Sequence, residues 1–202
     1  MENNPLPIEK HPFTPFLPEN ARVLFLGSFP PQEKRWSMKF YYPNWINDFW
    51  RIIGLIWYKD KDRFCIREEK RFDIESIVAF CTDKGFAMYD TASEIRRLKD
   101  NASDKFLEVV TPTDIPALLR QIPGCRTIVT TGEKATDTIV ERYGCSKPLI
   151  GTAVKVEIPG IGKVDFYRMP STSRAYPLSL EKKADAYREL FKKIDSENQL
   201  KL

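Results

Sequence analysis

The sequence predicts an α/β fold: a three-layer α/β/α sandwich around a central, mostly parallel sheet of about four to five strands. Two observations lead to this class. The apolar run at residues 23–26 has the length and continuity of a strand that is buried on both faces, and residues 127–131 form a further short run that is predicted as a strand. Segments with helical spacing of apolar residues lie between these runs. Strands that alternate with helices form parallel sheets covered on both faces.

The elements follow in chain order. Residues 1–20 contain five prolines and are expected to form an extended segment that wraps around the remainder. Residues 21–197 are expected to form a single domain, because 202 residues suffice for one sizeable core. The predicted elements are strand 22–27, a helix within 44–58 that includes Trp45, a charged connection 60–71, helix 74–82, a strand ending at Asp90, a polar stretch 96–105, helix 115–121, strand 127–131, helix 133–144, a hairpin within 153–171 and helix 179–194.

Composition and charge restrict the possible function classes. The 32 basic and 28 acidic residues leave a net charge of +4, which permits a polyanionic partner without requiring one. Four scattered cysteines without a CxxC pair, and a single histidine, His11, give no support for a metal site, and no cofactor is expected. His11 is expected to be structural or without a role. The chain shows neither a signal peptide nor an apolar run of membrane-spanning length, which predicts a cytoplasmic protein without a membrane partner.

The predicted topology indicates where chemistry would occur. Ligands of open α/β sheets bind outside the carboxyl ends of the strands. The segments at those ends read "GSFPP", "DTAS", "TGEKA" and "MPSTSR", and they are expected to converge.

Four ordered pieces of the sequence, "LFLGSFPP", "YYPNWINDFW", "GFAMYDTAS" and "MPSTSRAY", together resemble the uracil-DNA glycosylase superfamily. They are most similar to its mismatch-specific uracil/thymine-DNA glycosylase and DNA-deoxyinosine glycosylase branches. The resemblance runs from about residue 20 to about residue 195. It implies a monomeric, monofunctional glycosylase of base excision repair whose partner is double-stranded DNA containing a damaged or mismatched base: uracil, hypoxanthine or thymine opposite guanine. It implies no metal and no cofactor.

The resemblance also implies a base pocket and a DNA-contacting loop. An extruded base is stacked on aromatic side chains and read along its edge by polar groups. The implied base pocket contains Gly27, Ser28, Phe29, Phe40, Tyr41, Tyr42, Asp90 and Met169. The implied DNA contacts are Pro170, Ser171, Thr172, Ser173 and Arg174, with Lys34 and Arg35 beside the first piece. Arg174 would grip a phosphate or enter the gap left by the flipped base, and Tyr176 is the alternative for that second role.

Two positions depart from the family pattern. The first piece usually carries an aspartate or asparagine two residues after its glycine to orient water, where this chain has Phe29. In the deoxyinosine branch an asparagine of the next piece takes over, and Asn47 matches it. Asp48 and Asn44 are the alternatives, and Asn47 could instead only cap a helix. Met169 replaces the histidine of uracil-specific enzymes, which predicts weaker stabilisation of a uracil anion.

Two other functions remain open. The loss of the usual residue at Phe29 also fits a catalytically impaired DNA- or nucleotide-binding protein on the same scaffold. An α/β enzyme acting on a small nucleotide or sugar phosphate would keep the fold as well. No lysine stands in a motif position, which favours water over an amine as the nucleophile, although Lys134 lies close in topology.

Overall fold

The computed structural model describes residues 6–99 and 104–198, and its central sheet confirms the predicted fold class. The sheet has the order β5-β2-β8-β10-β9. The first four strands run parallel, and β9 pairs antiparallel with β10. Their bounds are Phe86–Asp90 (β5), Val23–Gly27 (β2), Thr127–Thr130 (β8), Gly162–Arg168 (β10) and Thr152–Ile158 (β9).

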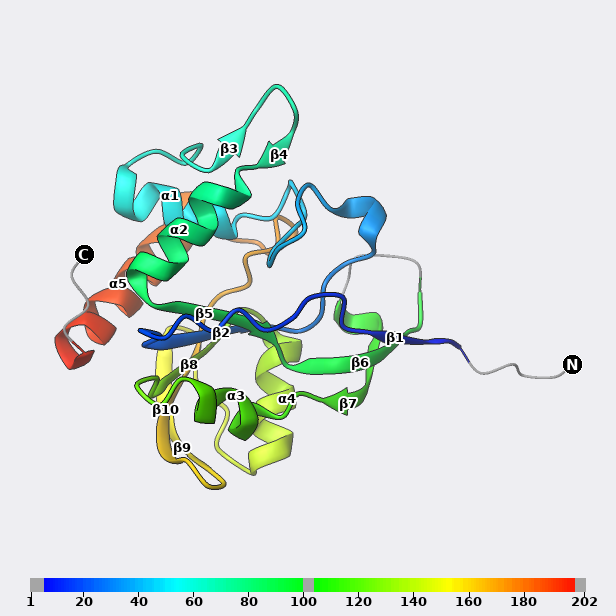
Figure 1. The fold of residues 1–202 in the computed structure, drawn as a ribbon, viewed down its shortest axis with the longest axis vertical. Helices are drawn as coiled ribbons and strands as arrows, with labels where there is room; N and C mark the ends of the chain where they lie inside the picture. Colours follow the sequence, from blue (N-terminus) through cyan, green and yellow to red (C-terminus); the bar gives the residue numbers. More distant parts are fainter. Residues whose placement is uncertain (1–5, 100–103, 199–202) are drawn as a thin grey trace, which may run out of the picture.

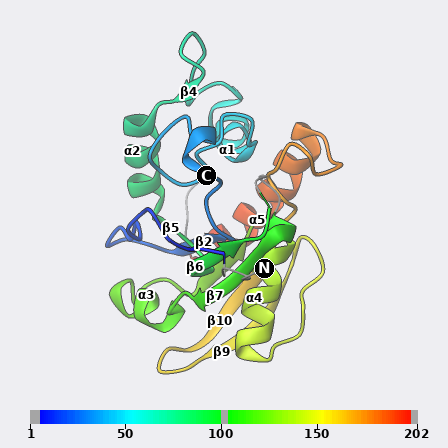
Figure 2. The same cartoon turned by 90° about the vertical axis from the view of Figure 1, so that its right-hand side faces the viewer.

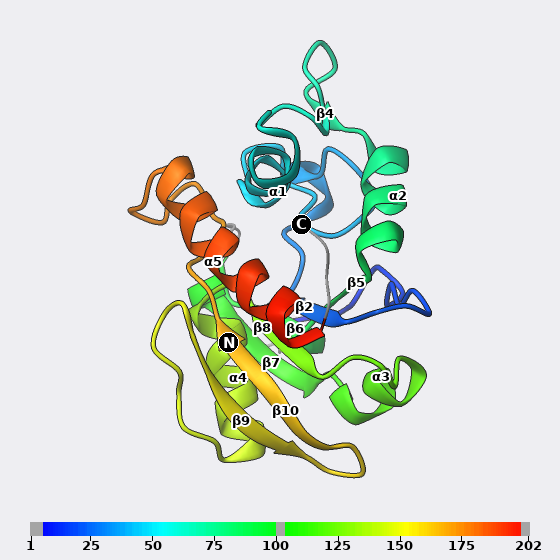
Figure 3. The same cartoon turned by 90° about the vertical axis from the view of Figure 1, so that its left-hand side faces the viewer.

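Helices cover both faces of this sheet, as Figure 1 shows. Helices α1 (Phe49–Tyr58), α2 (Ile74–Lys84) and α5 (Leu180–Asn198) lie on one face. The other face carries α3 (Ile115–Gln121) and α4 (Glu133–Tyr143). The long helix α5 runs across the sheet and packs against α1 (Figure 3).

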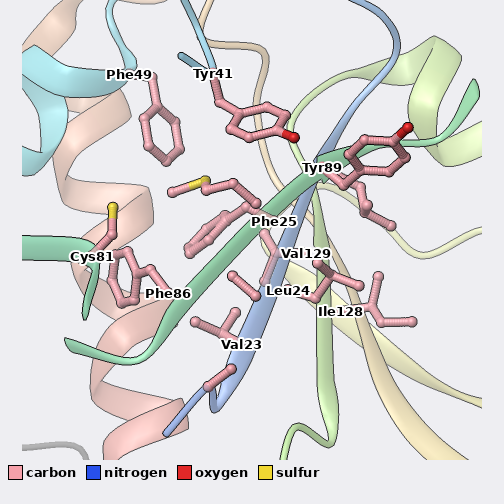
Figure 4. Close-up of a cluster of buried hydrophobic side chains, with 14 of the residues drawn as sticks. Val23, Leu24, Phe25, Tyr41, Phe49, Cys81, Phe86, Tyr89, Ile128 and Val129 are labelled. Atoms are coloured by element: carbon pink, nitrogen blue, oxygen red, sulfur yellow. The ribbon is translucent and has the colours of Figure 1, made fainter. Parts of the chain in front are cut away.

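The core lies between the sheet and the helices. Val23, Leu24 and Phe25 of β2 are fully buried, as expected for a central parallel strand. Phe25 contacts Phe49 of α1 and Phe86 of β5, with ring centroids 5.5 and 5.0 Å apart (Figure 4). This packing fixes the start of α1 next to the carboxyl end of β2.

A second, three-stranded antiparallel sheet was not predicted. It has the order β1-β6-β7, with bounds Ile8–Lys10, Ala92–Arg97 and Leu107–Pro112, and lies beside the carboxyl ends of β2 and β5 (Figure 2). The predicted polar stretch 96–105 overlaps this sheet, because β6 extends to Arg97. Only Ala92 and Ile95 of β6 are buried, against Phe29 and Leu107, and half of the strand's residues are charged, so it gave no apolar pattern.

Two further predictions need correction. Helix α1 begins at Phe49, and Trp45 precedes it, because Asn44 and Asn47 accept the amide N–H groups of Ile46 and Phe49 and form turns there. The charged connection 60–71 contains the two-stranded sheet of β3 (Cys65–Ile66) and β4 (Arg71–Phe72). In the part of the chain that the structure describes, no helix combines the length and the apolar character needed to cross a membrane.

Candidate active site

A pocket of about 960 Å³ opens at the carboxyl edge of the central sheet. Segments that are distant in sequence meet there: residues 27–31 after β2, residues 41–47 before α1, residues 131–134 after β8, and residues 168–177 after β10. From the middle piece only Asp90 lines the pocket, because β6 begins at Ala92 and carries the chain away. The size falls at the upper end of the range for ligand sites, roughly 300–1,000 Å³.

Gly27 allows the carboxylate of Asp90 to lie directly over the end of β2. A Cβ atom built on Gly27 would stand 2.4 Å from Asp90 Oδ1, closer than any real contact of that kind. Gly27 and Asp90 are paired across the β2–β5 ladder, and Thr91 N–H donates to the Gly27 carbonyl. The glycine is therefore needed for close approach, and it places an acidic group inside the pocket.

Of the aromatic residues before α1, Tyr41 and Tyr42 line the pocket, whereas Phe40 lies in the core. Tyr42 lines the pocket, stacks on Phe49 at 3.9 Å between ring centroids, and bonds Thr131 Oγ1 through its hydroxyl. Tyr41 also lines the pocket, although it is buried and its hydroxyl donates to the Thr14 carbonyl. Burial raises the pKa of both tyrosines well above the ordinary value, so both stay neutral. Phe40 does not line the pocket and packs in the core against Phe16.

Asn47 and Asp48 are adjacent but differently placed. Asn47 lines the pocket, and its Oδ1 accepts the Phe49 amide N–H at 2.8 Å. Asp48 is not among the lining residues. It is 4% exposed and forms ion pairs with Lys183 (Oδ2, 2.9 Å) and Arg174 (Oδ1, 3.2 Å). A carboxylate engaged by two cations is poorly suited to serve as a general base.

Hydrogen bonds from α5 and from Asp48 anchor the loop of residues 169–177. Tyr187 of α5 donates to the Pro170 carbonyl, and Asp48 N–H donates to that of Thr172. Lys183, which is fully buried, donates to the carbonyl of Ser173. These bonds leave the outer part of the loop for binding: Arg174 is an exposed residue at its tip.

The other predicted site residues also meet at the pocket, with one exception. Ser28, Phe29, Met169 and the run 170–173 line it, as does Arg35. Lys34 does not. Six basic residues and four acidic ones border the cavity, namely Arg35, Arg97, Lys105, Lys134, Arg168 and Arg174, with Asp90, Asp104, Glu133 and Asp137. The excess of cations suits an anionic ligand.

Asp104 was missed by the sequence analysis because it lies in a stretch without any pattern. It is an exposed residue at the pocket border, yet its carboxyl group bonds Ser28 and has lost much of its hydration. This desolvation, with repulsion from Asp90, raises the pKa of Asp104 to about 6 against the opposing effects of Ser28, Arg97 and Lys134. The pocket therefore holds a carboxyl group that titrates near neutral pH.

This pKa predicts a pH-dependent effect of Asp104→Asn on stability. The folded state binds the proton more tightly than the unfolded state, so the contribution is complete below pH 4 and is lost as the pH rises through about 6. Asp104→Asn should therefore stabilise the protein at pH 7.5, by at most about 1 kcal/mol because the residue is partly solvated, and not at pH 3.5, where the carboxyl group is largely protonated in both states. Urea unfolding at both values measures this, with exposed Asp83→Asn as control. Equal effects at both pH values would contradict the shift.

His11 was expected to be structural or idle, and the structure places it against the pocket. Its Nε2 lies 2.8 Å from Oδ2 of Asp90, and its side chain is 2% exposed. Its ring meets that of Phe29 edge to face at 5.2 Å. A histidine within a proline-rich segment carries no sequence signal for such a position, because the partner lies 79 residues away.

No family model matches the sequence, and no curated protein matches it significantly. Among solved structures, the fold is similar to the solution NMR structure of a proposed uracil DNA glycosylase from Methanosarcina acetivorans, with a TM-score of 0.59 and 21% sequence identity. The alignment covers 93% of this chain and 99% of that chain. At this identity the similarity establishes a shared fold, and the chemistry has to be argued from the pocket.

Proposed function

We propose that this protein is a DNA glycosylase that extrudes a deaminated or mismatched base from duplex DNA and hydrolyses its N-glycosidic bond, leaving an abasic site. The observation that carries the proposal is the pocket at the carboxyl edge of the sheet, with Tyr42 in its wall and a serine- and arginine-containing loop at its border. Chemistry on a base requires such a cavity, because the target atoms are inaccessible inside the stacked duplex. The similarity to a proposed uracil DNA glycosylase supports it.

The pocket can supply what the reaction requires. As the bond breaks, negative charge develops on the base and positive charge on the sugar, so catalysis needs hydrogen-bond donors at the base and a positioned water. Donors are available from the turn after Gly27 and from Lys134, both of which border the cavity. The ring of Tyr42, held flat against Phe49, offers a rigid surface on which a base can stack.

Asn47 is the proposed water-positioning residue. A carbonyl oxygen has two acceptor sites, so Oδ1 can bind a water molecule while the Phe49 N–H holds the amide in place. The hydrogen bond to Phe49 and the catalytic role are therefore compatible. Asp48, the alternative, is buried, forms ion pairs with Lys183 and Arg174 and does not line the pocket, which favours Asn47.

Excision assays on labelled duplexes test the function. End-labelled duplexes that carry uracil, hypoxanthine, xanthine or a G:T pair are incubated with the protein, and abasic sites are then cleaved by alkali. We expect strand breaks at one or more of these bases. If no duplex is cleaved, the enzyme proposal fails; persisting duplex binding would then favour the catalytically impaired protein. A covalent DNA adduct trapped by borohydride would identify an amine nucleophile, with Lys134 as the candidate, and would overturn the hydrolytic mechanism.

Asn47→Ala should lower kcat for the best substrate by about 100-fold, a typical value for a group that acts on the reacting water. It should also cost about 1 kcal/mol of stability through the lost hydrogen bond from the Phe49 N–H. Asn47→Ser separates the two effects, because a serine hydroxyl can accept the same N–H in a similar turn: stability should recover in part and kcat should not. Single-turnover rates and thermal unfolding measure both. Wild-type kcat in Asn47→Ala would remove this residue from the mechanism.

Arg174→Ala should weaken duplex binding and lower the slope of log Kd against log salt by about one, as expected for one lost phosphate contact. The exposed position of Arg174 at the loop tip supports this role. Lys193→Ala, which removes an exposed cation from the distal part of α5, is the matched control. Fluorescence anisotropy at several salt concentrations measures the slope. An unchanged slope in Arg174→Ala would exclude a phosphate contact there.

A further inference from the structure

A buried histidine–aspartate pair lies directly behind the pocket. His11 Nε2 is 2.8 Å from Asp90 Oδ2, and the two side chains are 2% and 10% exposed. The other ring nitrogen, Nδ1, lies 2.9 Å from the Phe13 carbonyl oxygen and 3.1 Å from the Phe13 amide. The ring also packs on Tyr89 at 4.5 Å between centroids. Contacts to both nitrogens and to the ring face hold the imidazole in one orientation.

The N-terminal segment that carries His11 is fastened on both sides of it. Before His11, strand β1 pairs with β6, and Glu9 forms two bonds of 3.0 Å with Arg97. After His11, Phe16 and Met88 exchange two backbone hydrogen bonds. The amide of His11 itself donates to the Ser93 carbonyl at 2.8 Å. The segment therefore delivers this side chain to a fixed place at the end of β5.

The two oxygens of Asp90 have different surroundings. Oδ2 is bonded to His11, and because an ionised carboxylate only accepts hydrogen bonds, Nε2 is the donor. Oδ1 lies over Gly27, and among residues 6–99 and 104–198 it accepts no hydrogen bond. Both Gly27 and Asp90 line the pocket. Oδ2 is thus hydrogen-bonded to His11, and Oδ1 is left as an acceptor for a ligand in the cavity.

We propose that His11 is a positioning residue that presents Asp90 Oδ1 as the acceptor for the ring N–H of an extruded base, so that the pocket selects bases produced by deamination. This inference rests on the proposed function. Deamination turns N1 of adenine or N3 of cytosine, both acceptors, into the N–H donors of hypoxanthine and uracil. A fixed carboxylate attracts the donor and repels the acceptor. Guanine and thymine also carry this N–H, and their exclusion from paired DNA depends on the cost of unpairing them.

Three variants test the pair. His11→Phe keeps an aromatic ring but removes the donor, and should lower kcat/KM for the excised base by about 100-fold. His11→Gln restores an amide donor near the place of Nε2 and should stay within about fivefold of wild type. In Asp90→Asn the amide oxygen accepts from His11 and the NH₂ group faces the pocket, so excision should fall at least 100-fold. The control is Lys10→Gln, which changes an exposed side chain of the same segment without touching the pair or the Glu9–Arg97 contact and should leave the activity unchanged.

Binding of free bases makes the result independent of catalysis. Calorimetry measures the affinity of the protein for each free base. Wild-type protein should bind hypoxanthine at least 30-fold more tightly than adenine, and uracil more tightly than cytosine by a similar factor. His11→Phe and Asp90→Asn should lose this preference. If the wild type excises bases but these variants keep wild-type kcat/KM and base preference, the inference is wrong and the proposed function stands. If no duplex is cleaved, the proposed function fails, and the binding preference alone decides the inference: equal affinity for hypoxanthine and adenine would overturn it.

Discussion

Replacing Lys183 with methionine should lower the free energy of unfolding by about 3–5 kcal/mol, the cost of leaving one partner of a buried ion pair. Lys183 is fully buried on α5, and its Nζ lies 2.9 Å from Asp48 Oδ2 and 2.8 Å from the Ser173 carbonyl oxygen. Methionine fills a similar volume but donates nothing. Asp48 would remain buried, with only the exposed Arg174 as a cation.

Urea unfolding of Lys183→Met and of the double variant Asp48→Asn/Lys183→Met measures this effect. The double variant removes both charges, so it should recover a large part of the lost stability. Lys182→Met, the neighbouring exposed lysine, is the control and should change the free energy of unfolding by less than about 0.5 kcal/mol. A loss below about 1 kcal/mol in Lys183→Met would show that the pair does not hold α5 to the start of α1.

Gly27→Ala should reduce excision by about 100-fold or more while costing only about 1–3 kcal/mol of stability. The new Cβ would stand 2.4 Å from Asp90 Oδ1, so the carboxylate has to turn away from the pocket or leave His11. A displacement of about 1 Å at a binding group is enough for a loss of this size.

The double variant Gly27→Ala/Asp90→Ala separates crowding from function. Removing the carboxylate makes room for the new methyl group, so stability should recover, whereas activity should not. Single-turnover excision and thermal unfolding of the single and double variants measure the two effects. Wild-type activity in Gly27→Ala would mean that the close approach of Asp90 to β2 has no part in the reaction.

The central layer of the fold could be predicted closely from local patterns. Helix α3 was expected at 115–121 and is found there, because Asp114 caps it and its apolar residues recur at helical spacing. Strand β2 is a continuous apolar run before Gly27, and β8 consists of β-branched residues that are all buried, so both runs stand out from the flanking loops. Strand β6 has only two buried side chains and gave no comparable pattern.

The place of the pocket could also be predicted, since parallel strands bring their carboxyl ends to one edge. Its composition was predicted only in part. Gly27, Tyr42, Asn47, Asp90 and the 169–174 loop line it as expected, whereas Phe40 turned out to be a core residue and Asp104 was overlooked. Whether an aromatic residue faces the pocket or the core depends on its neighbours in space, which a single sequence does not specify.

The sequence by itself determined the layers, the edge where ligands bind and the loops that meet there, because these follow from the spacing of apolar residues along the chain. Only the tertiary structure decided the buried polar pairs: His11 with Asp90, 79 residues apart, and Asp48 with Lys183, 135 residues apart. The physical reason is that a buried charge is tolerated only beside a partner, and packing of distant segments selects that partner. The role proposed for His11 depends on a contact of that kind, whereas the hydrogen bond that holds the Asn47 side chain comes from Phe49, two residues away.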